Sequence, residues 1–417
     1  MAEALSRMGA VVVEGPKAVG KTSTATLQAG TVVRLDDRSD PRVAAAFDLD
    51  PSLILTGAAP VLLDEWQEIP ELWNRVRHEV DDRGGQPGQF ILTGSSTPDD
   101  QARRHSGAGR FAMIQMRPLS LFESGHSTGE VSLAALFEGV SPHGYDAEWN
   151  ATDARTQLAQ RIVVGGWPVN IGVPVETAAR NNADYLAAIR EHDLPRLEGR
   201  DPGTAAKVVR AYARVVSTPA YETTIARGAS AGQSDDLHVG LDATSRDTVR
   251  RHLAALERLR IVEDLPAWAP PLRSSARTNT APKRHFVDPS LAAAALNVGW
   301  QPLAAEPLTL GLWFESLAVR DLRIYAQRLG GRVLYYRDSD KLEIDAVVEL
   351  PDGRWGAFEV KAGTGKATMD TAVANLQRLR AKVDDNRCAF LAVLTGGGVA
   401  ARGQNGVCVV PLRMLAP

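Results

Sequence analysis

Short apolar runs alternate with helix-forming polar stretches along the first third of the chain. Residues 10–13, 60–65 and 89–96 each contain a run of Val, Leu, Ile or Phe with the length of a buried strand. Strands that alternate with helical segments are typical of a parallel sheet covered by helices. We therefore expect residues 1–125 to fold as an α/β domain built on a parallel sheet.

The pattern becomes helical after residue 155. Residues 156–215 carry apolar positions at helical spacing, and residues 245–257 predict an amphipathic helix with Ser245 as its N-cap. Residues 261–268 follow as an apolar strand. Helices followed by strands are the order of a winged helix, so we expect residues 156–290 to be a helical and winged-helix region.

The last part of the chain returns to strands. Residues 342–348 and 355–361 are apolar runs joined across a Pro-Asp-Gly turn, and Trp313 is expected to open a helix before them. Residues 291–417 therefore predict a second α/β domain. Residues 126–155 are rich in Gly and Ser, fit neither pattern, and are expected to be a linker.

A glycine-rich loop follows the first strand. Its sequence, Gly-Pro-Lys-Ala-Val-Gly-Lys-Thr, fits the phosphate-binding loop G-x-x-x-x-G-K-[ST] at every fixed position, and a helix can begin after it. Glycines let backbone N–H groups turn toward phosphate oxygens, and the helix N-terminus favours negative charge. We expect nucleotide binding by the following loop residues: Gly15, Lys17, Gly20, Lys21 and Thr22. Lys21 would contact the β- and γ-phosphates, and the Thr22 hydroxyl would bind Mg²⁺.

Two carboxylates end the second strand. Asp64 would bind Mg²⁺, and Glu65 would orient or deprotonate the attacking water. Thr93 ends the third strand and is expected to lie near the γ-phosphate, because the carboxyl ends of parallel strands meet at the edge where ligands bind. Without the glycine loop, each of these strand ends would be an ordinary polar turn.

Charged residues interrupt the apolar strands near the C-terminus. Asp345 lies within one strand, and Glu359 and Lys361 lie two residues apart on the next, so they share a face. This order fits the D…(D/E)-x-K pattern of metal-dependent nucleases, in which carboxylates bind Mg²⁺ and the lysine steadies water and phosphate charge. We expect a metal site at Asp345 and Glu359, with Glu315 joining from a helix. The alternative is a structural salt bridge between Asp345 and Lys361.

The amphipathic helix also carries basic residues. Arg246, Arg250 and Arg251 lie on its polar side, where they could contact phosphates of DNA or RNA. A winged-helix fold does not by itself dictate nucleic-acid binding. A solvated helix that contacts protein is therefore an equal alternative.

Composition limits these functions. The chain has 417 residues, of which 44% are hydrophobic and 23% charged, which suits two or three globular domains. A net charge of −3 gives no general attraction to nucleic acid, so any such contact must be local. The two cysteines have no metal-binding spacing and suit a reducing cytoplasm. We expect no signal peptide and no membrane span, since no apolar segment reaches roughly 18 residues.

Taken together, the chain resembles a bacterial and archaeal family of AAA-like P-loop ATPases that carry a C-terminal domain related to restriction-endonuclease-like folds. The resemblance covers nearly the whole length. It depends on these segments and residues: 15–22, 62–67, 91–96, Gly109, Arg110, 117–120, 165–168, 205–260, Phe314, Glu315, Asp345 and 359–361. Residues 125–150 fit the family pattern poorly.

The resemblance implies an α/β protein with three parts: a P-loop NTPase domain with an AAA-like parallel sheet, a helical and winged-helix middle, and a C-terminal restriction-endonuclease-like α/β domain. It also implies ATP and Mg²⁺ as ligands, ATP hydrolysis and a cytoplasmic role. Arg110 matches a Gly-Arg pair that follows the sensor strand, which makes it a candidate γ-phosphate sensor or arginine finger. A finger acting in trans would need a homo-oligomer.

Two functions compete on these grounds. In the first, ATP hydrolysis gates a C-terminal nuclease through the winged helix. In the second, ATP sets a conformation that presents a catalytically silent C-terminal domain to a protein partner, as a signalling switch or scaffold. Both need Lys21 and Asp64, and they differ chemically at Asp345, Glu359 and Lys361. A small-molecule kinase is disfavoured, because the acidic pair after the second strand suits water activation.

Overall fold

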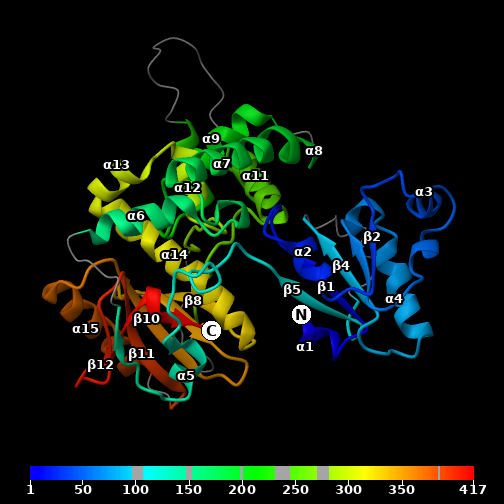
Figure 1. Ribbon diagram of the computed structural model, residues 1–417. Coiled ribbons are helices and arrows are strands. Elements are labelled where there is room, and N and C mark those ends of the chain that lie inside the picture. The colour runs from blue at the N-terminus through cyan, green and yellow to red at the C-terminus, as the bar shows by residue number, and fades with distance from the viewer. Residues whose placement is uncertain (96–106, 147–152, 198–200, 231–244, 270–280, 384–385) are drawn as a thin grey trace, which may run out of the picture. The chain divides into compact units, whose positions relative to one another are not determined.

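The computed structural model describes residues 1–95, 107–146, 153–197, 201–230, 245–269, 281–383 and 386–417 (Figure 1). The chain divides into two compact units. Met1–Arg117 and Leu256–Ile261 make unit 1, and Pro118–Ala255 and Val262–Pro417 make unit 2. Each unit contains its own sheet and its own hydrophobic core.

Unit 1 is built on a five-stranded sheet with the order β2-β3-β4-β1-β5 (Figure 1). The strands are β1 Ala10–Glu14, β2 Thr31–Arg34, β3 Val61–Asp64, β4 Phe90–Gly94 and β5 Phe111–Gln115. Every pairing is parallel, so the carboxyl ends of the strands lie along one edge. The expected parallel α/β sheet is therefore confirmed, although Ser96 at the end of the expected third strand lies outside the described residues.

Short helices precede and connect these strands. They are α1 Ala2–Leu5, α2 Lys21–Thr26, α3 Pro41–Asp48 and α4 Leu72–Asp82, with 3-10 turns at Pro51–Ile54 and Trp66–Glu68. The helix α2 begins directly after the glycine loop, as the sequence predicts, and extends for 6 residues. At the start of α3, the Asp40 side chain accepts a hydrogen bond from the Arg42 N–H, and Pro41 takes the first helical position.

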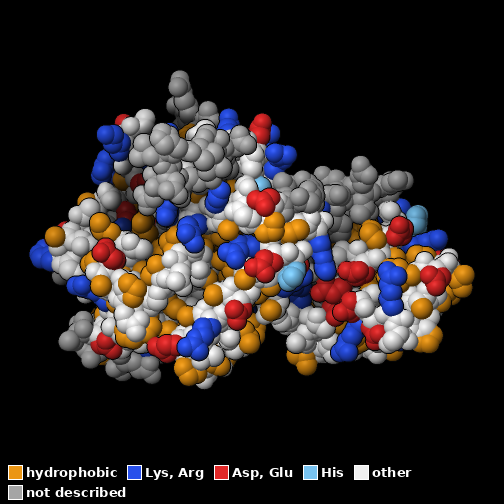
Figure 2. Space-filling model, turned by 90° about the horizontal axis from the view of Figure 1, so that it is seen from above, with side chains coloured by type: hydrophobic (Ala, Val, Ile, Leu, Met, Phe, Trp, Pro, Cys, Tyr) orange, Lys and Arg blue, Asp and Glu red, His pale blue; other side chains and the backbone are white. Residues whose placement is uncertain are grey.

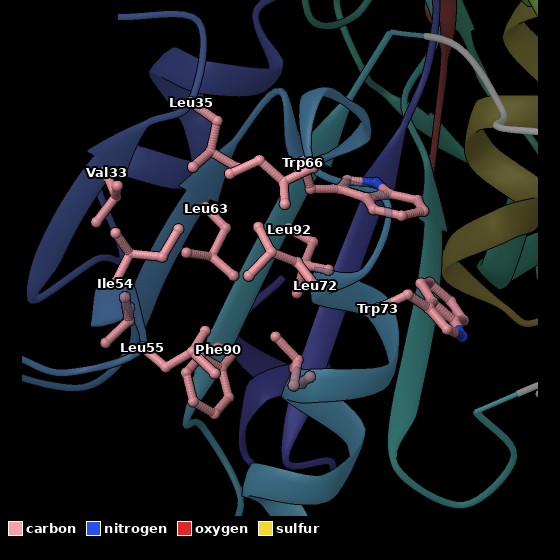
Figure 3. Packing of buried hydrophobic residues seen from close by; sticks show 14 of the residues in the cluster. Val33, Leu35, Ile54, Leu55, Leu63, Trp66, Leu72, Trp73, Phe90 and Leu92 are labelled. Atoms are coloured by element: carbon pink, nitrogen blue, oxygen red, sulfur yellow. The ribbon is translucent and has the colours of Figure 1, made fainter. Parts of the chain in front are cut away.

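Apolar side chains bury both faces of this sheet. On one face, Leu63 and Leu92 belong to a cluster that includes Trp66 and residues of α3 and α4 (Figure 3). On the other face, their neighbours Leu62 and Ile91 pack in a second cluster with α1 and α2. Successive strand residues alternate between the faces. Because both faces are covered, β1, β3 and β4 carry apolar residues at consecutive positions before their polar ends, rather than at every second position.

Helices make up the middle of the chain. They are α6 Ala154–Val164, α7 Val175–Ala188, α8 Leu194–Arg196, α9 Pro202–Ala213, α10 Glu222–Ser230, α11 Arg246–Arg258, α12 Ser290–Leu296 and α13 Trp300–Ala305, with a 3-10 turn at Pro168–Asn170 and a π-helical turn at Ile189–Asp193. The amphipathic helix expected at residues 245–257 is α11. The Ser245 hydroxyl caps it by accepting a hydrogen bond from the Thr248 N–H at 3.1 Å.

The continuous strand expected at residues 261–268 is not observed. Instead, Val262 and Leu265 form isolated antiparallel bridges with Phe286 and Lys283, respectively. Residues 270–280, between the two bridged segments, lie outside the described residues. The winged helix therefore stays a prediction.

A seven-stranded mixed sheet forms the rest of unit 2, with the order β7-β12-β13-β11-β10-β9-β8. Its strands are β7 Gly144–Tyr145, β8 Arg332–Arg337, β9 Glu343–Glu349, β10 Trp355–Lys361, β11 Cys388–Thr395, β12 Val399–Arg402 and β13 Cys408–Pro411. The strands β8, β9 and β10 are antiparallel, whereas β11 is parallel to β10. The helices α14 Pro307–Arg328 and α15 Lys366–Val383 both pack against β9 and β10.

The structure differs from the sequence expectation at two further places in unit 2. Trp313 lies inside α14, because the helix begins earlier, with Pro307 in its first turn. The segment 126–155, expected to be a linker, contains β6 Val131–Ser132, α5 Leu133–Phe137 and β7; β6 pairs with β14 Leu415–Ala416, and β7 pairs with β12. Strands of two residues have no hydrophobic period, so the sequence pattern does not reveal them.

Candidate functional site

The phosphate-binding loop lies between β1 and α2 at the carboxyl edge of the parallel sheet. Glycine is required at position 15, because a Cβ atom there would lie 2.4 Å from the Met116 carbonyl oxygen. Gly20 has a φ of 91°, a left-handed conformation that favours glycine, and it is the N-cap of α2. The backbone of the loop therefore has the shape that its two fixed glycines predict.

The Lys21 side chain folds back over this loop. Its ammonium group donates hydrogen bonds to the carbonyl oxygens of Gly15 at 2.9 Å and Pro16 at 2.8 Å. Burial lowers the pKa of Lys21 to about 8, while the carboxylates of Glu65 and Asp64 oppose that shift. A buried ammonium at the end of the loop is placed where phosphate oxygens would replace weaker carbonyl partners.

Asp64, at the end of β3, accepts two hydroxyl hydrogen bonds on one oxygen. Thr22 Oγ1 donates to Asp64 Oδ1 at 2.9 Å, and Thr93 Oγ1 donates to the same atom. The sheet explains this convergence, since β4 lies between β1 and β3 and Thr93 is in register with both Val13 and Asp64. Hydroxyl and carboxylate oxygens are the ligands that Mg²⁺ prefers, so this donor set fits the cation.

Glu65 follows Asp64 in an uncommon backbone conformation. Its φ of 56° and ψ of 47° are left-handed, which costs a residue with a Cβ roughly 1–2 kcal/mol. The Glu65 carboxylate accepts hydrogen bonds from the Ser95 hydroxyl at 3.1 Å and from the Gln67 amide. Two donors therefore hold this carboxylate beside the nucleotide edge, and one of them, Gln67, is the last residue of the segment 62–67 on which the family resemblance depends.

Arg110 lies at the opposite end of the strands from the phosphate-binding loop, where β1 and β5 begin. It directly precedes β5, and its carbonyl oxygen accepts a hydrogen bond from the N–H of Ala10, the first residue of β1. Its guanidinium pairs with Asp81 at 2.9 Å. A strand of 5 residues, at about 3.3 Å per residue, puts roughly 16 Å between this position and the loop. The fold therefore does not bring Arg110 to the nucleotide site of its own chain.

The charged residues expected near the C-terminus lie in one cluster in unit 2. Lys361 Nζ contacts Asp345 at 3.1 Å and Glu359 at 2.6 Å. Asp345 also accepts a hydrogen bond from the Val360 N–H at 2.8 Å, and Glu359 accepts one from the Asn375 side chain on α15 at 3.0 Å. The face-sharing of Glu359 and Lys361 and the salt bridge between Asp345 and Lys361 are both present.

A second lysine, which no motif indicates, lies among the same carboxylates. Lys283 Nζ contacts Glu315 at 2.8 Å, Glu343 at 2.8 Å and Asp345 at 3.4 Å. The Tyr335 ring lies beside it, with its centroid 5.5 Å from the ammonium nitrogen. Glu315 is thus brought to the cluster from α14, but its partner there is an ammonium group.

The cluster shifts the acidity of its members in opposite directions. Burial raises the pKa of Glu315 to about 8, and burial together with the charge of Asp345 raises the pKa of Glu359 to about 7. Burial disfavours the Asp345 carboxylate too, but the ammonium groups of Lys283 and Lys361 outweigh it and lower the pKa of Asp345 to about 2.

Ammonium groups, rather than a shared cation position, separate these carboxylates. Within the part of the chain that the structure describes, no three His, Cys, Asp or Glu side chains are grouped so that they could hold one metal ion. The side chains of Glu315, Asp345 and Glu359 have suitable oxygen donors for Mg²⁺. Their present arrangement, with Lys283 and Lys361 between them, does not fit a metal ion.

The arginines of α11 are exposed but engaged with acidic neighbours. Arg246 pairs with Glu222 at 2.8 Å, and Arg250 pairs with Asp247 at 3.0 Å. Arg251 donates to the Asp247 carbonyl at 3.4 Å. On the face that Figure 2 draws, the described basic side chains are scattered among acidic and apolar ones. The structure therefore leaves both nucleic acid and protein open as partners of α11.

Comparison with known proteins assigns a class to the first part of the chain only. Residues 7–124 match the family model of an AAA domain. Residues 155–302 and 310–415 match two domains of unknown function, DUF8612 and DUF4143, respectively. The chain therefore carries an AAA-like P-loop domain at its N-terminal end, followed by two segments without an assigned activity.

Two mycobacterial proteins are similar to most of the chain. They are uncharacterized protein Mb2031c of Mycobacterium bovis and uncharacterized protein Rv2008c of Mycobacterium tuberculosis, each 27% identical over 390 residues, which cover 90% of this chain and 76% of the relative. Among solved structures, protein VC1899 from Vibrio cholerae aligns with 97% of this chain and 94% of its own at 11% identity, but the TM-score is 0.20. That score does not support a shared fold.

Among the described residues, no helix combines the length and the apolar character needed to cross a membrane.

Proposed function

We propose that this chain binds ATP with Mg²⁺ and hydrolyses it. One observation carries the proposal: Thr22 and Thr93 direct their hydroxyl groups at one oxygen of Asp64, beside the phosphate-binding loop. This convergence places two hydroxyl groups and a carboxylate at the carboxyl ends of the parallel strands, next to the loop whose carbonyl oxygens hold the buried Lys21. The match of residues 7–124 to an AAA domain supports the same assignment.

Each residue of the site has a distinct role in this proposal. Backbone N–H groups of the loop, from Gly15 to Thr22, would bind phosphate oxygens, and Lys21 would neutralise charge on the β- and γ-phosphates. The Thr22 hydroxyl and the Asp64 carboxylate would hold Mg²⁺, whose charge would offset the negative charge that develops on the transferred phosphoryl group. Thr93 would contact the γ-phosphate once its hydroxyl leaves Asp64.

Glu65 is the proposed general base. Its carboxylate is held by Ser95 and Gln67, which fixes its orientation without neutralising its charge. We propose Arg110 only as an arginine finger that acts in trans, from a second copy of the chain, because in its own chain it lies at the amino-terminal ends of the strands. This role of Arg110 requires a homo-oligomer, whereas the proposed roles of the other site residues do not.

Removal of the Lys21 charge tests the nucleotide site. Lys21→Ala should weaken ATP–Mg²⁺ binding by a few kcal/mol, because hydrogen bonds to charged groups are worth ~1.5–3 kcal/mol each. Lys17→Ala removes the same charge from an exposed position in the same loop and is the matched control, with a smaller expected effect. Isothermal titration with ATP measures both. Equal affinities for the wild type and Lys21→Ala would refute the site.

The second proposed function is a metal-dependent nuclease in unit 2, gated by ATP and acting on DNA or RNA. The convergence of Asp345, Glu359 and Lys361, with Glu315 from α14, favours it. The order of elements also supports a restriction-endonuclease-like domain: a helix, three antiparallel strands, a helix and a parallel strand. We propose domains at residues 1–125, 156–290 and 291–417, with 126–155 joining them.

The competing proposal is a cytoplasmic signalling switch or scaffold with a silent C-terminal cluster. The ion pairs of Lys283 and Lys361 favour it, since they satisfy the carboxylates without a metal. Nuclease assays on single- and double-stranded DNA and RNA, with Mg²⁺ and with or without ATP, separate the two. Cleavage that Asp345→Asn abolishes supports the nuclease. No cleavage under any of these conditions supports the switch.

A further inference from the structure

Lys283 is completely buried in the C-terminal carboxylate cluster. Its side chain is 0% exposed, and its ammonium group contacts Glu315, Glu343 and Asp345 at 2.8, 2.8 and 3.4 Å. Lysine is almost never fully buried unless it is paired. The burial of an ammonium group is tolerated only where opposite charges replace its water, and the three carboxylates do so here.

The Lys283 main chain belongs to a different part of unit 2 from these carboxylates. Its N–H donates to the Leu265 carbonyl at 3.0 Å, and its carbonyl accepts from the Leu265 N–H at 2.8 Å. The carboxylates are carried by α14 and β9 instead. The ammonium group of Lys283 comes from the segment 283–286, which bridges to residues 262–265. It therefore enters a cluster whose carboxylates belong to α14 and β9.

The two carboxylate oxygen atoms of Asp345 contact two different ammonium groups. Its Oδ2 atom accepts from Lys361 and the Val360 N–H, whereas its Oδ1 atom faces Lys283. Lys361 is part of the nuclease pattern, and Lys283 is not. A divalent cation bound by Glu315 and Asp345 would need the oxygen atoms that Lys283 contacts. Two cations cannot share these oxygen atoms, because they repel each other strongly in a buried site.

We propose that the Lys283 ammonium group occupies the cation position of the C-terminal cluster and keeps divalent metal ions out of it. The cluster accepts Mg²⁺ or Mn²⁺ through Glu315 and Asp345 only when this ammonium group is absent from it. The inference rests on the second proposed function, since it describes the control of that same cluster. It explains why carboxylates of the nuclease pattern converge without leaving a metal position.

Manganese binding to the full-length protein without nucleotide tests this inference. Free Mn²⁺ is counted by electron paramagnetic resonance, and thermal unfolding with and without Mn²⁺ gives a second readout. Lys283→Ala should gain one Mn²⁺ site, at least tenfold tighter than any in the wild type, and Mn²⁺ should raise its melting temperature. Lys283→Gln keeps two N–H donors for the carboxylates and should gain the site with less disturbance of folding.

Two control variants make the result specific to the cluster. Lys382 also lies between two carboxylates, with Asp338 at 2.5 Å and Asp340 at 2.6 Å, but at a partly exposed position. Lys382→Ala should gain no Mn²⁺ site of this affinity. The double variant Lys283→Ala/Asp345→Asn should lose the site that Lys283→Ala gains.

Three outcomes are distinguishable. Binding that appears only in the Lys283 variants and depends on Asp345 supports the inference. The wild type could instead bind Mn²⁺ as tightly as Lys283→Ala does, in a way that depends on Asp345. That result would support the proposed metal function and overturn the role of Lys283. No binding in folded Lys283→Ala or Lys283→Gln overturns both. If Lys283→Ala does not fold, Lys283→Gln decides between these outcomes.

Discussion

At the residue scale, the nucleotide site depends on the surroundings of single carboxylates. Asp64 and Glu65 are adjacent, yet Asp64 is held by Thr22 and Thr93, and Glu65 by Ser95 and Gln67. Separate partners keep the two charged groups in separate positions. Neighbouring carboxylates can therefore serve metal binding and water activation without competing for one proton.

Glu65→Gln separates hydrolysis from binding. The change keeps the shape of the side chain and its contacts near Ser95 but removes the base. We expect ATP affinity within a few-fold of the wild type and a turnover lower by ~10²–10⁴. Steady-state phosphate release and ATP titration measure the two quantities. Unchanged turnover would assign the base to another group, whereas lost affinity would give Glu65 a role in binding.

The raised pKa of Glu359 predicts a pH dependence of stability. This pKa rises from 4.5 to about 7 on folding, so the folded state binds the proton more tightly. The contribution of Glu359 to the free energy of unfolding is then fully present below about pH 4.5. It is lost as the pH rises through about 7, and the loss is on the order of 3 kcal/mol. Glu359→Gln should lack this decrease. Urea unfolding of the wild type and Glu359→Gln at about pH 5 and about pH 8, with chelator present, measures this change. An equal change in the free energy of unfolding between the two pH values in both proteins would contradict the prediction.

At the element scale, sequence patterns predict what lies within one element and miss what several elements bring together. The glycine loop, Asp64 at the end of β3 and the Glu359–Lys361 pair on β10 are each encoded locally, and each takes its expected place. Lys283 is 32 residues from Glu315 and 62 from Asp345 in sequence. No rule of sequence spacing predicts a contact between residues so far apart. The contact is seen only in the structure, where the segment 283–286 brings Lys283 to α14 and β9.

The arginines of α11 allow a test at this scale. Arg246 and Arg250 form ion pairs with Glu222 and Asp247 through exposed guanidinium groups. Such pairs at the surface contribute about 0–1 kcal/mol, so phosphates can replace these partners easily. If α11 contacts nucleic acid, changing Arg246, Arg250 and Arg251 to Ala should weaken duplex binding regardless of sequence. The slope of log K against log salt should flatten by up to about 3.

Fluorescence anisotropy over a range of salt concentrations measures this effect. Arg332→Ala is a suitable control, because Arg332 is 70% exposed and pairs with Glu349 in the β8–β9 hairpin rather than on α11. Absence of duplex binding by the wild type at low salt would assign α11 to protein contacts instead.

At the scale of the whole molecule, a short anchored segment follows the sheet of unit 1. The Met116 N–H donates to the Glu14 carbonyl at 2.7 Å, at the end of β1. Five residues later, the Leu121 N–H donates to the buried Asp321 carboxylate on α14 at 3.0 Å. The same helix carries Glu315 of the C-terminal cluster. The segment 116–121 therefore leads from the end of β5, which pairs with β1, to a hydrogen bond with the helix that contributes to the second proposed site.

This connection predicts that Asp321 transmits the effect of ATP to α14. Asp321→Asn exchanges a charged acceptor for a neutral one at the Leu121 N–H and at its other partner, Arg320. It should leave ATP turnover within about twofold of the wild type, because Asp321 lies on α14 in unit 2 and is not part of the proposed nucleotide site. Hydrogen exchange of the α14 peptides should change on ATP addition in the wild type and much less in Asp321→Asn. Lys21→Ala, in which ATP–Mg²⁺ binding should be weaker by a few kcal/mol, sets the baseline at an ATP concentration that saturates the wild type but not this variant. An equal response in Asp321→Asn would show that this anchor does not couple the units, and no response in the wild type would leave the AAA-like domain without an effect on α14.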